Sequence, residues 1–465
     1  ICLNNKFILY ELIMINETNK IIDLLGGTSI LAKLLGVNLS AVSNYRKKGF
    51  PARLHYKIAS LCNERGISID EKIFGGISRN ILPMDSRPIE ILSEVSIDIM
   101  ENLVGKEFEL IDPPILVSAD KVLDRLGENI ADRLYIFSDP AGTRLCLRPD
   151  LTIPTCIHYL NSGFTGEKKN YAYHGKVFQF QNPSSDEPNE FSQAGLESIG
   201  GDSSLDSEVE IFYRTYDSLK KAGIKTLNIS MGDISLFSLL IDVLDIPIIW
   251  KDQLKTKFWN DKNFKLLLDE LSIKKKFDNK LIYKISDLDQ EMAEVFVRDA
   301  IGLSENQSPV GRTVREITER LMKKSQELNT KPLSKNTSDL IRNFLSISDS
   351  PKEAIKKLKS ILKNVDSKLD IKIEIINERI DRIMNLNIDL KDSIFSLEKG
   401  RTVEYYTGFL FDFNCPILSN SINIAGGGRY DDLMKSVSSE LDIPAFGAAL
   451  NLERIEKVIA KEKLS

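Results

Sequence analysis

Residues 401–413 read RTVEYYTGFLFDF, and residues 426–432 read GGGRYDD. Both stretches carry strand signals, and consecutive glycines let a backbone approach a ligand closely. The chain then closes with NLERIEKVIAKE at residues 451–462, which has the spacing of an amphipathic helix. Strands on both sides of a helical segment, followed by a final helix, predict an antiparallel α+β domain.

Upstream of this region the chain alternates between strand and helix patterns. FELIDPPILV at 108–117 predicts a strand that stops at Pro113 and Pro114, and RLYIFSDPAGTRLCLRP at 133–149 predicts a hairpin that turns at 139–142. Residues 224–390 are mostly charged and amphipathic, which indicates an inserted helical subdomain. The expected layout is a small domain at 14–76, a linker at 77–86, core at 87–223, insertion at 224–390 and core again at 391–465.

Composition limits the classes of function. The 465 residues are 42% hydrophobic and carry a formal net charge of -5, which predicts two or three folded domains and excludes a uniformly basic nucleic-acid binder. Five separated cysteines with no CxxC pair and three histidines without zinc spacing predict a reduced, cytoplasmic setting and no structural metal. No run approaches the ~20 apolar residues of a membrane helix.

The amino-terminal segment has the spacing of two short helices joined by a tight turn. Thr28 is predicted to cap the first helix, Gly36 to end it, Ser40 to cap the second helix and Gly49 to stop it. The small core between the helices is predicted to contain Ala32, Leu35 and Val42. These positions resemble the Cro/YdaS-like family of helix-turn-helix DNA-binding domains, and the segment would be a small all-α domain.

The same segment is locally basic. Residues 17–60 contain seven Lys or Arg and two Asp or Glu, and seven minus two gives a charge of +5. The resemblance implies that the second helix faces DNA, with polar side chains on base edges and Arg46 and Lys48 on phosphates. The predicted DNA-binding residues are Ser40, Ser43, Asn44, Arg46, Lys47 and Lys48. An oligomerisation or docking role for the module remains an alternative.

Four segments in chain order resemble the class II aminoacyl-tRNA synthetase core of the histidine type. They are LRPDLT at 147–152, FSQAGLE at 191–197, RTVEYYTG at 401–408 and GGGRYDD at 426–432, the last followed by PAFG at 444–447 and Glu453-Arg454. The resemblance implies a histidine pocket in which acidic groups hold the ammonium and imidazole, Arg401 holds the carboxylate, and tyrosines flank the ring. The predicted histidine-binding residues are Asp150, Thr152, Gln193, Glu197, Arg401, Tyr405 and Tyr406.

The sequence departs from a ligase where ATP would bind. Gln179 stands where the synthetases have an arginine, the loop at 182–190 is acidic, and no Lys or Arg occurs between Lys176 and Arg214. A polyanion there would face like charges, at a cost of several kcal/mol in a semi-buried cleft. Asn451 also replaces an expected glycine. We therefore expect neither adenylation nor a cofactor.

With these departures, the chain resembles the family of ATP phosphoribosyltransferase regulatory subunits. These proteins are paralogues of the synthetases that have no anticodon-binding domain. The chain ends at Ser465, soon after Arg454, so that domain is not expected. The resemblance implies a non-catalytic partner that activates the short catalytic subunit and transmits feedback inhibition by histidine in the first step of histidine biosynthesis. It also implies a homodimer within a hetero-oligomer.

Two other functions stay open at this point. One is a divergent histidyl-tRNA synthetase that uses Lys176 and Arg454 as phosphate ligands. The other is a histidine-responsive DNA-binding regulator, in which the core senses histidine and the amino-terminal module reads an operator. The second requires one continuous polypeptide, whereas a product that starts at Met84 would separate the two activities.

Overall fold

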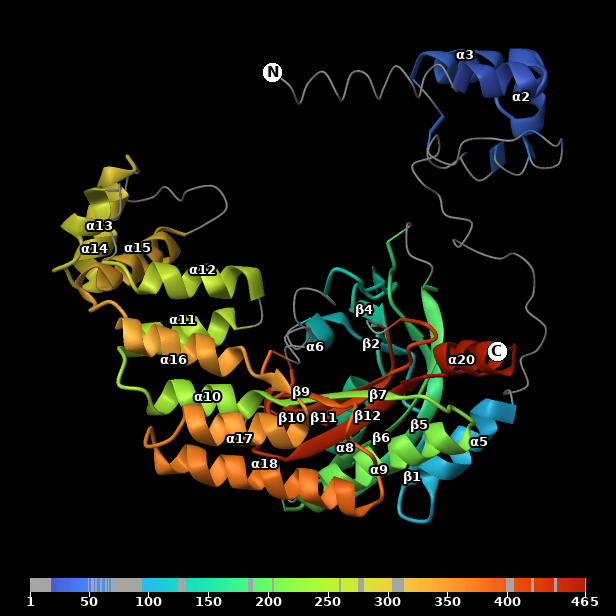
Figure 1. The fold of residues 1–465 in the computed structure, drawn as a ribbon. Coiled ribbons are helices and arrows are strands. Elements are labelled where there is room, and N and C mark those ends of the chain that lie inside the picture. Colours follow the sequence, from blue (N-terminus) through green and yellow to red (C-terminus); the bar gives the residue numbers. More distant parts are fainter. Residues whose placement is uncertain are drawn as a thin grey trace. The chain divides into compact units, whose positions relative to one another are not determined.

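The computed structural model divides into two compact units, residues 1–91 with 181–189 (unit 1) and residues 92–180 with 190–465 (unit 2). It describes residues 18–48, 50–51, 54, 57–58, 61–62, 65, 67, 94–123, 131–182, 187–202, 205–258, 261–274, 280–302, 313–398, 405–419, 422–438 and 441–464. The linker predicted at 77–86 lies outside these residues. Each unit is therefore described by itself (Figure 1).

In the described part of unit 1, α2 (Gly27–Leu35) and α3 (Leu39–Lys48) pack against each other. Gly36 follows α2 in the left-handed conformation, at φ 69°, as its predicted helix-ending role requires. The predicted core residues Ala32, Leu35 and Val42 are all buried.

Both helix-cap predictions in unit 1 were wrong. Helix α2 begins at Gly27, so Thr28 lies inside the helix, where its hydroxyl accepts a 3.1 Å hydrogen bond from Arg46 Nε. The cap at the start of α3 is Asn38, whose Oδ1 accepts from the backbone N–H of Ala41, while Ser40 donates its hydroxyl to Asn38.

Unit 2 is built on a nine-stranded sheet in the order β1-β5-β6-β12-β11-β10-β7-β9-β8. The five neighbouring pairs from β5 to β7 are antiparallel, as predicted, whereas β1–β5 and β7–β9 are parallel. A parallel pair needs a crossover, and the helical insertion supplies the one between β7 and β9. The strands are β1 (Glu109–Ile111), β5 (Lys169–Phe178), β6 (Glu190–Ile199), β7 (Asn228–Asp233), β8 (Ser348–Asp349), β9 (Ile394–Ser396), β10 (Phe409–Asn414), β11 (Asn423–Arg429) and β12 (Ala445–Asn451).

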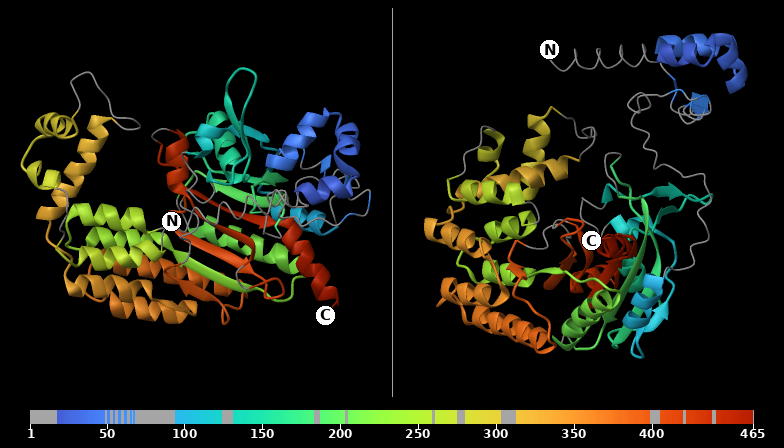
Figure 2. Two further views of the ribbon diagram at one scale, coloured as in Figure 1. Left: turned by 90° about the horizontal axis from the view of Figure 1, so that it is seen from above. Right: turned by 45° about the vertical axis from the view of Figure 1, so that its right-hand side comes forward.

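Strand alternation sends neighbouring side chains into two different cores. Tyr171 packs into a cluster with residues of α8, whereas the adjacent Ala172 packs into the larger cluster beneath α5 and α9. Figures 1 and 2 show α5 and α9 along the same side of the sheet. The helices of the two layers are α5 (Glu94–Val104), α6 (Ala119–Leu123), α8 (Thr152–Asn161), α9 (Leu205–Lys221), α19 (Asp431–Ser438) and α20 (Leu452–Leu464).

A second, three-stranded sheet has the order β2-β4-β3, with β2 (Leu116–Ser118), β3 (Ile136–Ser138) and β4 (Arg144–Leu147). It contains the predicted hairpin, whose turn is closed by a 2.9 Å hydrogen bond from Gly142 N–H to the Asp139 carbonyl. Gly142 has φ 85°, a conformation that favours glycine.

The helical insertion lies between β7 and β9. The helices at its two ends stack beside the sheet, and those in its middle pack together around a separate hydrophobic cluster (Figure 2). Strand β7 falls within the segment expected to be helical and belongs to the main sheet. The insertion comprises α10 (Ile234–Val243), α11 (Ile248–Lys257), α12 (Asp261–Leu271), α13 (Lys280–Lys284), α14 (Gln290–Ala300), α15 (Val314–Asn329), α16 (Lys335–Leu345), α17 (Pro351–Ile361) and α18 (Ser367–Asn385).

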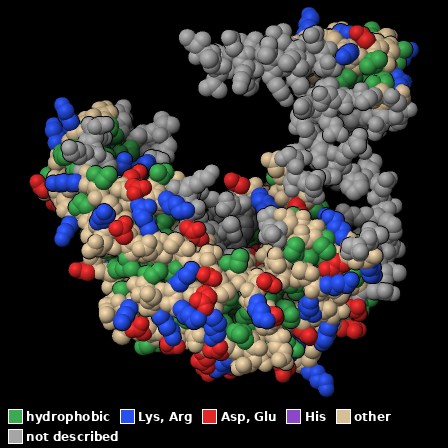
Figure 3. Space-filling model, in the orientation of Figure 1, with side chains coloured by type: hydrophobic (Ala, Val, Ile, Leu, Met, Phe, Trp, Pro, Cys, Tyr) green, Lys and Arg blue, Asp and Glu red, His purple; other side chains and the backbone are tan. Residues whose placement is uncertain are grey.

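The surface of unit 2 mixes charges of both signs. On the face drawn in Figure 3, Lys and Arg side chains are interspersed with Asp and Glu side chains over the helices. Within the described part of the chain, no helix has the length and apolar character needed to cross a membrane.

Candidate functional site

A small pocket opens at the centre of the main sheet. Its wall is contributed by the start of α8 and the loop before it, by β6, β11 and β12, and by the residues that precede β10 and follow β11. The lining residues are Asp150, Thr152, Gln193, Tyr405, Tyr406, Gly426, Tyr430, Gly447, Ala448 and Ala449. Segments that are distant in the sequence therefore meet at one site.

Glu197 lies beneath this pocket and is completely buried. Its Oε1 accepts a 2.8 Å hydrogen bond from the Tyr173 hydroxyl, and its Oε2 accepts one from the Tyr430 hydroxyl. Burial raises the pKa of Glu197 to about 7, although the tyrosine hydroxyls favour the charged form. Both carboxylate oxygens are thus occupied by residues of β5 and of the β11–α19 corner.

Gly447 makes room for this carboxylate. It lies opposite Glu197 in the β6–β12 register, and a Cβ atom at position 447 would come within 1.4 Å of Glu197 Oε2. No side chain can be accommodated there without displacing the glutamate. Only glycine is therefore compatible with the buried carboxylate at this point of the sheet.

Asp150 places a second carboxyl group on the pocket wall. Its Oδ1 accepts a 3.0 Å hydrogen bond from the Ile153 backbone N–H at the start of α8. Burial raises its pKa to about 6, and the backbone hydrogen bonds partly oppose this shift. Gln193 holds the same loop, because its Oε1 accepts a 2.8 Å hydrogen bond from Leu151 N–H. The pocket is consequently acidic, and the loop that carries Asp150 is hydrogen-bonded to β6.

Aromatic rings cover another side of the pocket. Tyr405 and Tyr406 meet edge to face at 5.0 Å between ring centroids, and Tyr405 packs against Tyr430 at 6.3 Å. Gly426 lines the pocket as predicted, but Gly428 has a different role: a Cβ atom there would lie 2.8 Å from the Tyr406 ring. Glycine at 428 therefore allows an aromatic side chain to approach the strand.

The basic residues near the site are engaged by protein groups. Lys176 Nζ lies 3.2 Å from Glu453 Oε1, and Arg454 Nη1 donates to the carbonyl and the side-chain oxygen of Asn423, at 2.7 and 2.9 Å. Gln179 donates to the Pro149 carbonyl at 2.8 Å. No lysine or arginine occurs among the described residues that line the pocket.

The structure brings five of the seven predicted histidine-binding residues together on the pocket wall: Asp150, Thr152, Gln193, Tyr405 and Tyr406. Glu197 is adjacent but lies below the wall, and Arg401 lies outside the described residues. Sequence reasoning missed Tyr430 and Gly447. Tyr430 stands inside the GGGRYDD stretch, so the motif pointed to it, but its contact with β6 could be seen only in three dimensions.

The predicted DNA-binding residues lie on α3 of unit 1. The side chains of Ser40, Ser43, Asn44 and Lys47 are exposed, and that of Lys48 lies outside the described residues. Arg46, predicted to reach phosphate, instead donates within the unit to Thr28 and Asn19 and pairs with Asp23. This pairing keeps the pKa of Asp23 below its usual value.

Comparison with known proteins gives consistent matches over unit 2. The family model for histidyl-tRNA synthetase matches residues 78–294 and 295–455. A protein of Brucella canis named ATP phosphoribosyltransferase regulatory subunit is 30% identical over 366 residues, which cover 78% of this chain and 96% of that protein. A protein of Agrobacterium fabrum with the same name is 27% identical over 383 residues, 81% of this chain and 100% of that protein.

Solved structures show the same fold. The crystal structure described as an ATP phosphoribosyltransferase regulatory subunit/histidyl-tRNA synthetase from Bacillus halodurans superposes with a TM-score of 0.52 at 19% identity and covers 78% of each chain. The α+β fold expected from the sequence, with a synthetase-like sheet and a helical insertion, is thereby confirmed.

Proposed function

Because the chain belongs to the histidyl-tRNA synthetase family, and within it to the ATP phosphoribosyltransferase regulatory subunits, we propose that it binds histidine in the Asp150 pocket as an effector and catalyses no reaction itself. In this role it activates the short catalytic subunit of ATP phosphoribosyltransferase in the cytoplasm and transmits feedback inhibition by histidine. Coupling of this kind requires that histidine bind two assembly states with different affinity.

The observation that carries the proposal is an acidic, tyrosine-lined pocket in which none of the described lining residues is basic. Asp150 faces the pocket and can hold an ammonium group, while the Tyr430 hydroxyl and the rings of Tyr405 and Tyr406 suit an imidazole. A phosphate-bearing ligand is disfavoured, because Asp150 and the nearby Glu197 would repel it. The ammonium and imidazole groups of histidine fit this distribution of charge, and the residue predicted to hold its carboxylate, Arg401, lies outside the described residues.

The contacts of the nearby cations support a non-catalytic role. Adenylate formation needs positive charge aimed at the α-phosphate. Lys176 is paired with Glu453, and Arg454 is hydrogen-bonded to Asn423. Gln179 supplies no charge at the position where the synthetases have arginine. The alternative function, that of a divergent histidyl-tRNA synthetase, would require Lys176 and Arg454 to break these contacts.

The test is isothermal titration of histidine into the full chain, together with an ATP–pyrophosphate exchange assay. We expect saturable histidine binding and no histidine-dependent exchange above background. Exchange above background would instead establish the ligase. Absence of histidine binding at millimolar concentration would remove the effector role. Histidinol, which lacks the carboxylate, provides a control for recognition of the whole amino acid.

We propose a second activity for unit 1, which is binding of DNA through α3. The supporting observation is that Ser40, Ser43, Asn44 and Lys47 are exposed together on one short helix next to a tight turn. Polar side chains of this kind can bond to base edges while lysine contacts phosphate. Binding of the full chain to labelled duplex DNA, measured by anisotropy, should weaken steeply as salt is raised.

A further inference from the structure

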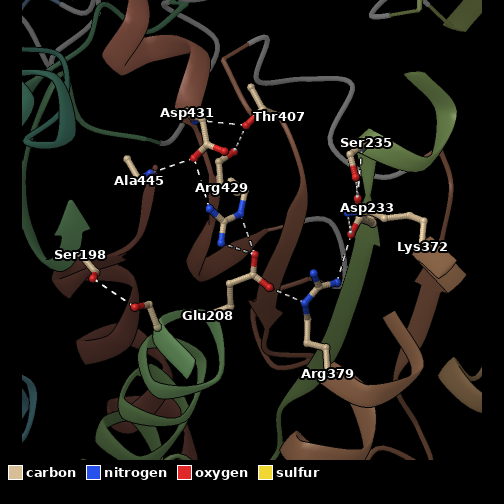
Figure 4. A network of polar contacts seen from close by, with 11 residues as sticks. Ser198, Glu208, Asp233, Ser235, Lys372, Arg379, Thr407, Arg429, Asp431 and Ala445 are labelled. Atoms are coloured by element: carbon tan, nitrogen blue, oxygen red, sulfur yellow. Dashed lines mark hydrogen bonds and ion pairs between the residues drawn. The ribbon is translucent and has the colours of Figure 1, made fainter. Parts of the chain in front are cut away.

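A network of buried and half-buried charged side chains lies between the pocket and the base of the helical insertion. It contains three carboxylates and three cations, so its formal charge is balanced. Figure 4 shows these side chains pointing toward one another from α9, β7, α18, β11 and the start of α19. The six residues are Glu208, Asp233, Lys372, Arg379, Arg429 and Asp431.

Glu208 is the centre of the network. It lies in the first turn of α9 with a side chain only 2% exposed, and its two oxygens serve different partners. Oε1 accepts from Arg429 Nε and Nη2, both at 2.7 Å, and Oε2 accepts from Arg379 Nε. A single carboxylate therefore joins β11 of the sheet to α18 of the insertion.

On the side of the insertion, Arg379 connects both ends of the helical segment. Its side chain is 3% exposed, and its Nη1 donates at 3.0 Å to Asp233 Oδ2. Asp233 ends β7 and caps α10, because its Oδ1 accepts from the Ser235 backbone N–H at 3.1 Å. Lys372, also on α18, lies 3.6 Å from the same carboxylate. The first and last helices of the insertion are thus held at one point.

On the side of the pocket, the network holds both chain neighbours of Tyr430. Arg429 is fixed by Glu208, and Asp431 Oδ1 lies 3.3 Å from Arg429 Nη1 and accepts a 2.8 Å hydrogen bond from Ala445 N–H. Thr407 also holds Arg429, because the Thr407 backbone N–H donates a 2.7 Å hydrogen bond to the Arg429 carbonyl. Tyr430 itself lines the pocket and donates to Glu197.

We infer that Glu208 and Arg379 are positioning residues, which hold the Tyr430 corner of the histidine pocket and connect its occupancy to the α10 and α18 helices of the insertion. The inference rests on the proposed binding of histidine in this pocket. Charged groups buried this deeply have no solvent to replace a missing partner, so loss of one carboxylate forces its arginines to move. Packed elements that shift in this way can carry energetic coupling between distant sites.

The variants Glu208→Gln and Arg379→Lys test this assignment in the full chain. Glutamine keeps the shape of Glu208 without its charge, and lysine keeps the charge of Arg379 without its forked donors. The matched control is Arg382→Gln, which breaks the Arg382–Asp206 ion pair between the same two helices at an exposed position, where the two side chains are 41% and 77% exposed. Surface pairs of this kind contribute little.

Two measurements are made on each variant: isothermal titration of histidine, and amide hydrogen exchange with and without saturating histidine. For the parent chain and Arg382→Gln we expect equal affinity and slower exchange in β11, α10 and α18 when histidine is bound. For Glu208→Gln and Arg379→Lys we expect at least fivefold weaker binding. In these variants the slowing should persist in β11 and disappear in α18.

The outcomes separate this inference from the proposed function. If the parent chain does not bind histidine, both are overturned. If it binds histidine and the two network variants match it in affinity and in exchange of α18, only the inference is overturned. If Glu208→Gln does not fold, Arg379→Lys decides alone by the same criteria.

Discussion

The Tyr173 hydroxyl donates a 2.8 Å hydrogen bond to Glu197 Oε1, and this contact lies below the pocket wall. Tyr430 occupies the other carboxylate oxygen, and Thr152 Oγ1 lies 3.5 Å from the Tyr173 hydroxyl. The glutamate therefore orients two tyrosines, one of which faces the pocket. We therefore propose that Glu197 acts on a ligand through Tyr430, while its direct contact with the imidazole, expected from the sequence, stays a prediction.

Replacing Glu197 with glutamine should weaken histidine binding tenfold or more, which corresponds to about 1.4 kcal/mol. Glutamine can accept from one tyrosine only, so the other hydroxyl must reorient. The chain should remain folded, because the two side chains have nearly the same shape. Calorimetric titration measures the affinity, and Glu210→Gln, on α9 and paired with Arg214, is the control that should bind normally. Unchanged affinity in Glu197→Gln would exclude this role.

Asp150 should make ligand-free stability depend on pH. Its pKa is raised by burial to about 6, so the folded chain resists ionising this group more than the unfolded chain does. The resulting destabilisation is absent below about pH 4, where the carboxyl group is protonated in both states, and is complete above about pH 6.

Asp150→Asn removes that destabilisation while it keeps an acceptor for Ile153 N–H. The variant should therefore unfold at a higher temperature than the parent at pH 8, with a smaller difference at pH 5. Scanning calorimetry without histidine measures both values. A lower midpoint for the variant at pH 8, or the same difference at both pH values, would contradict the assignment. Histidine binding by the variant should be lost.

In unit 1, Arg46 and Lys47 should respond differently to substitution. Arg46→Ala removes the contacts with Thr28, Asn19 and Asp23, so it should make the unit more susceptible to limited proteolysis. Lys47→Ala should leave proteolysis unchanged and weaken DNA binding on all sequences alike. If Lys47→Ala binds DNA like the parent at every salt concentration, α3 is not the DNA-binding surface.

Exposed apolar side chains on β1, on the three-stranded sheet and beside them support the proposed homodimer. They include Leu110, Ile115, Leu116, Ile136, Phe137 and Phe180, each between 38% and 60% exposed. Light scattering at micromolar concentration should give the mass of two chains, and Leu116→Glu should lower it toward one. Leu266→Glu, on α12 at 60% exposure, is the control that should leave the mass unchanged. A monomeric parent chain would refute the prediction.

The sequence predicted local structure best where the signal itself is local. The 139–142 turn and the stop after β1 follow from nearby residues, whereas the pocket residues on β6 were expected from the resemblance to the synthetases. Contacts between residues that are far apart in the sequence were harder to predict. Gln193 and Glu197 are four residues apart on β6 and so lie on one face of the strand. Whether Glu197 reaches a ligand also depends on Tyr173 and Tyr430, which come from other segments. Arg46 was likewise predicted to contact phosphate, because its ion-pair partner Asp23 lies in a segment before α2 and is distant in the sequence.

The most direct test of the regulatory role is the rate of phosphoribosyl transfer by the short ATP phosphoribosyltransferase chain of the same organism, measured with and without this protein while histidine is titrated. We predict that transfer requires both chains, and that histidine inhibits the pair with wild-type protein but much less with Asp150→Asn. A catalytic chain whose rate is the same with and without this protein would rule out the regulatory role.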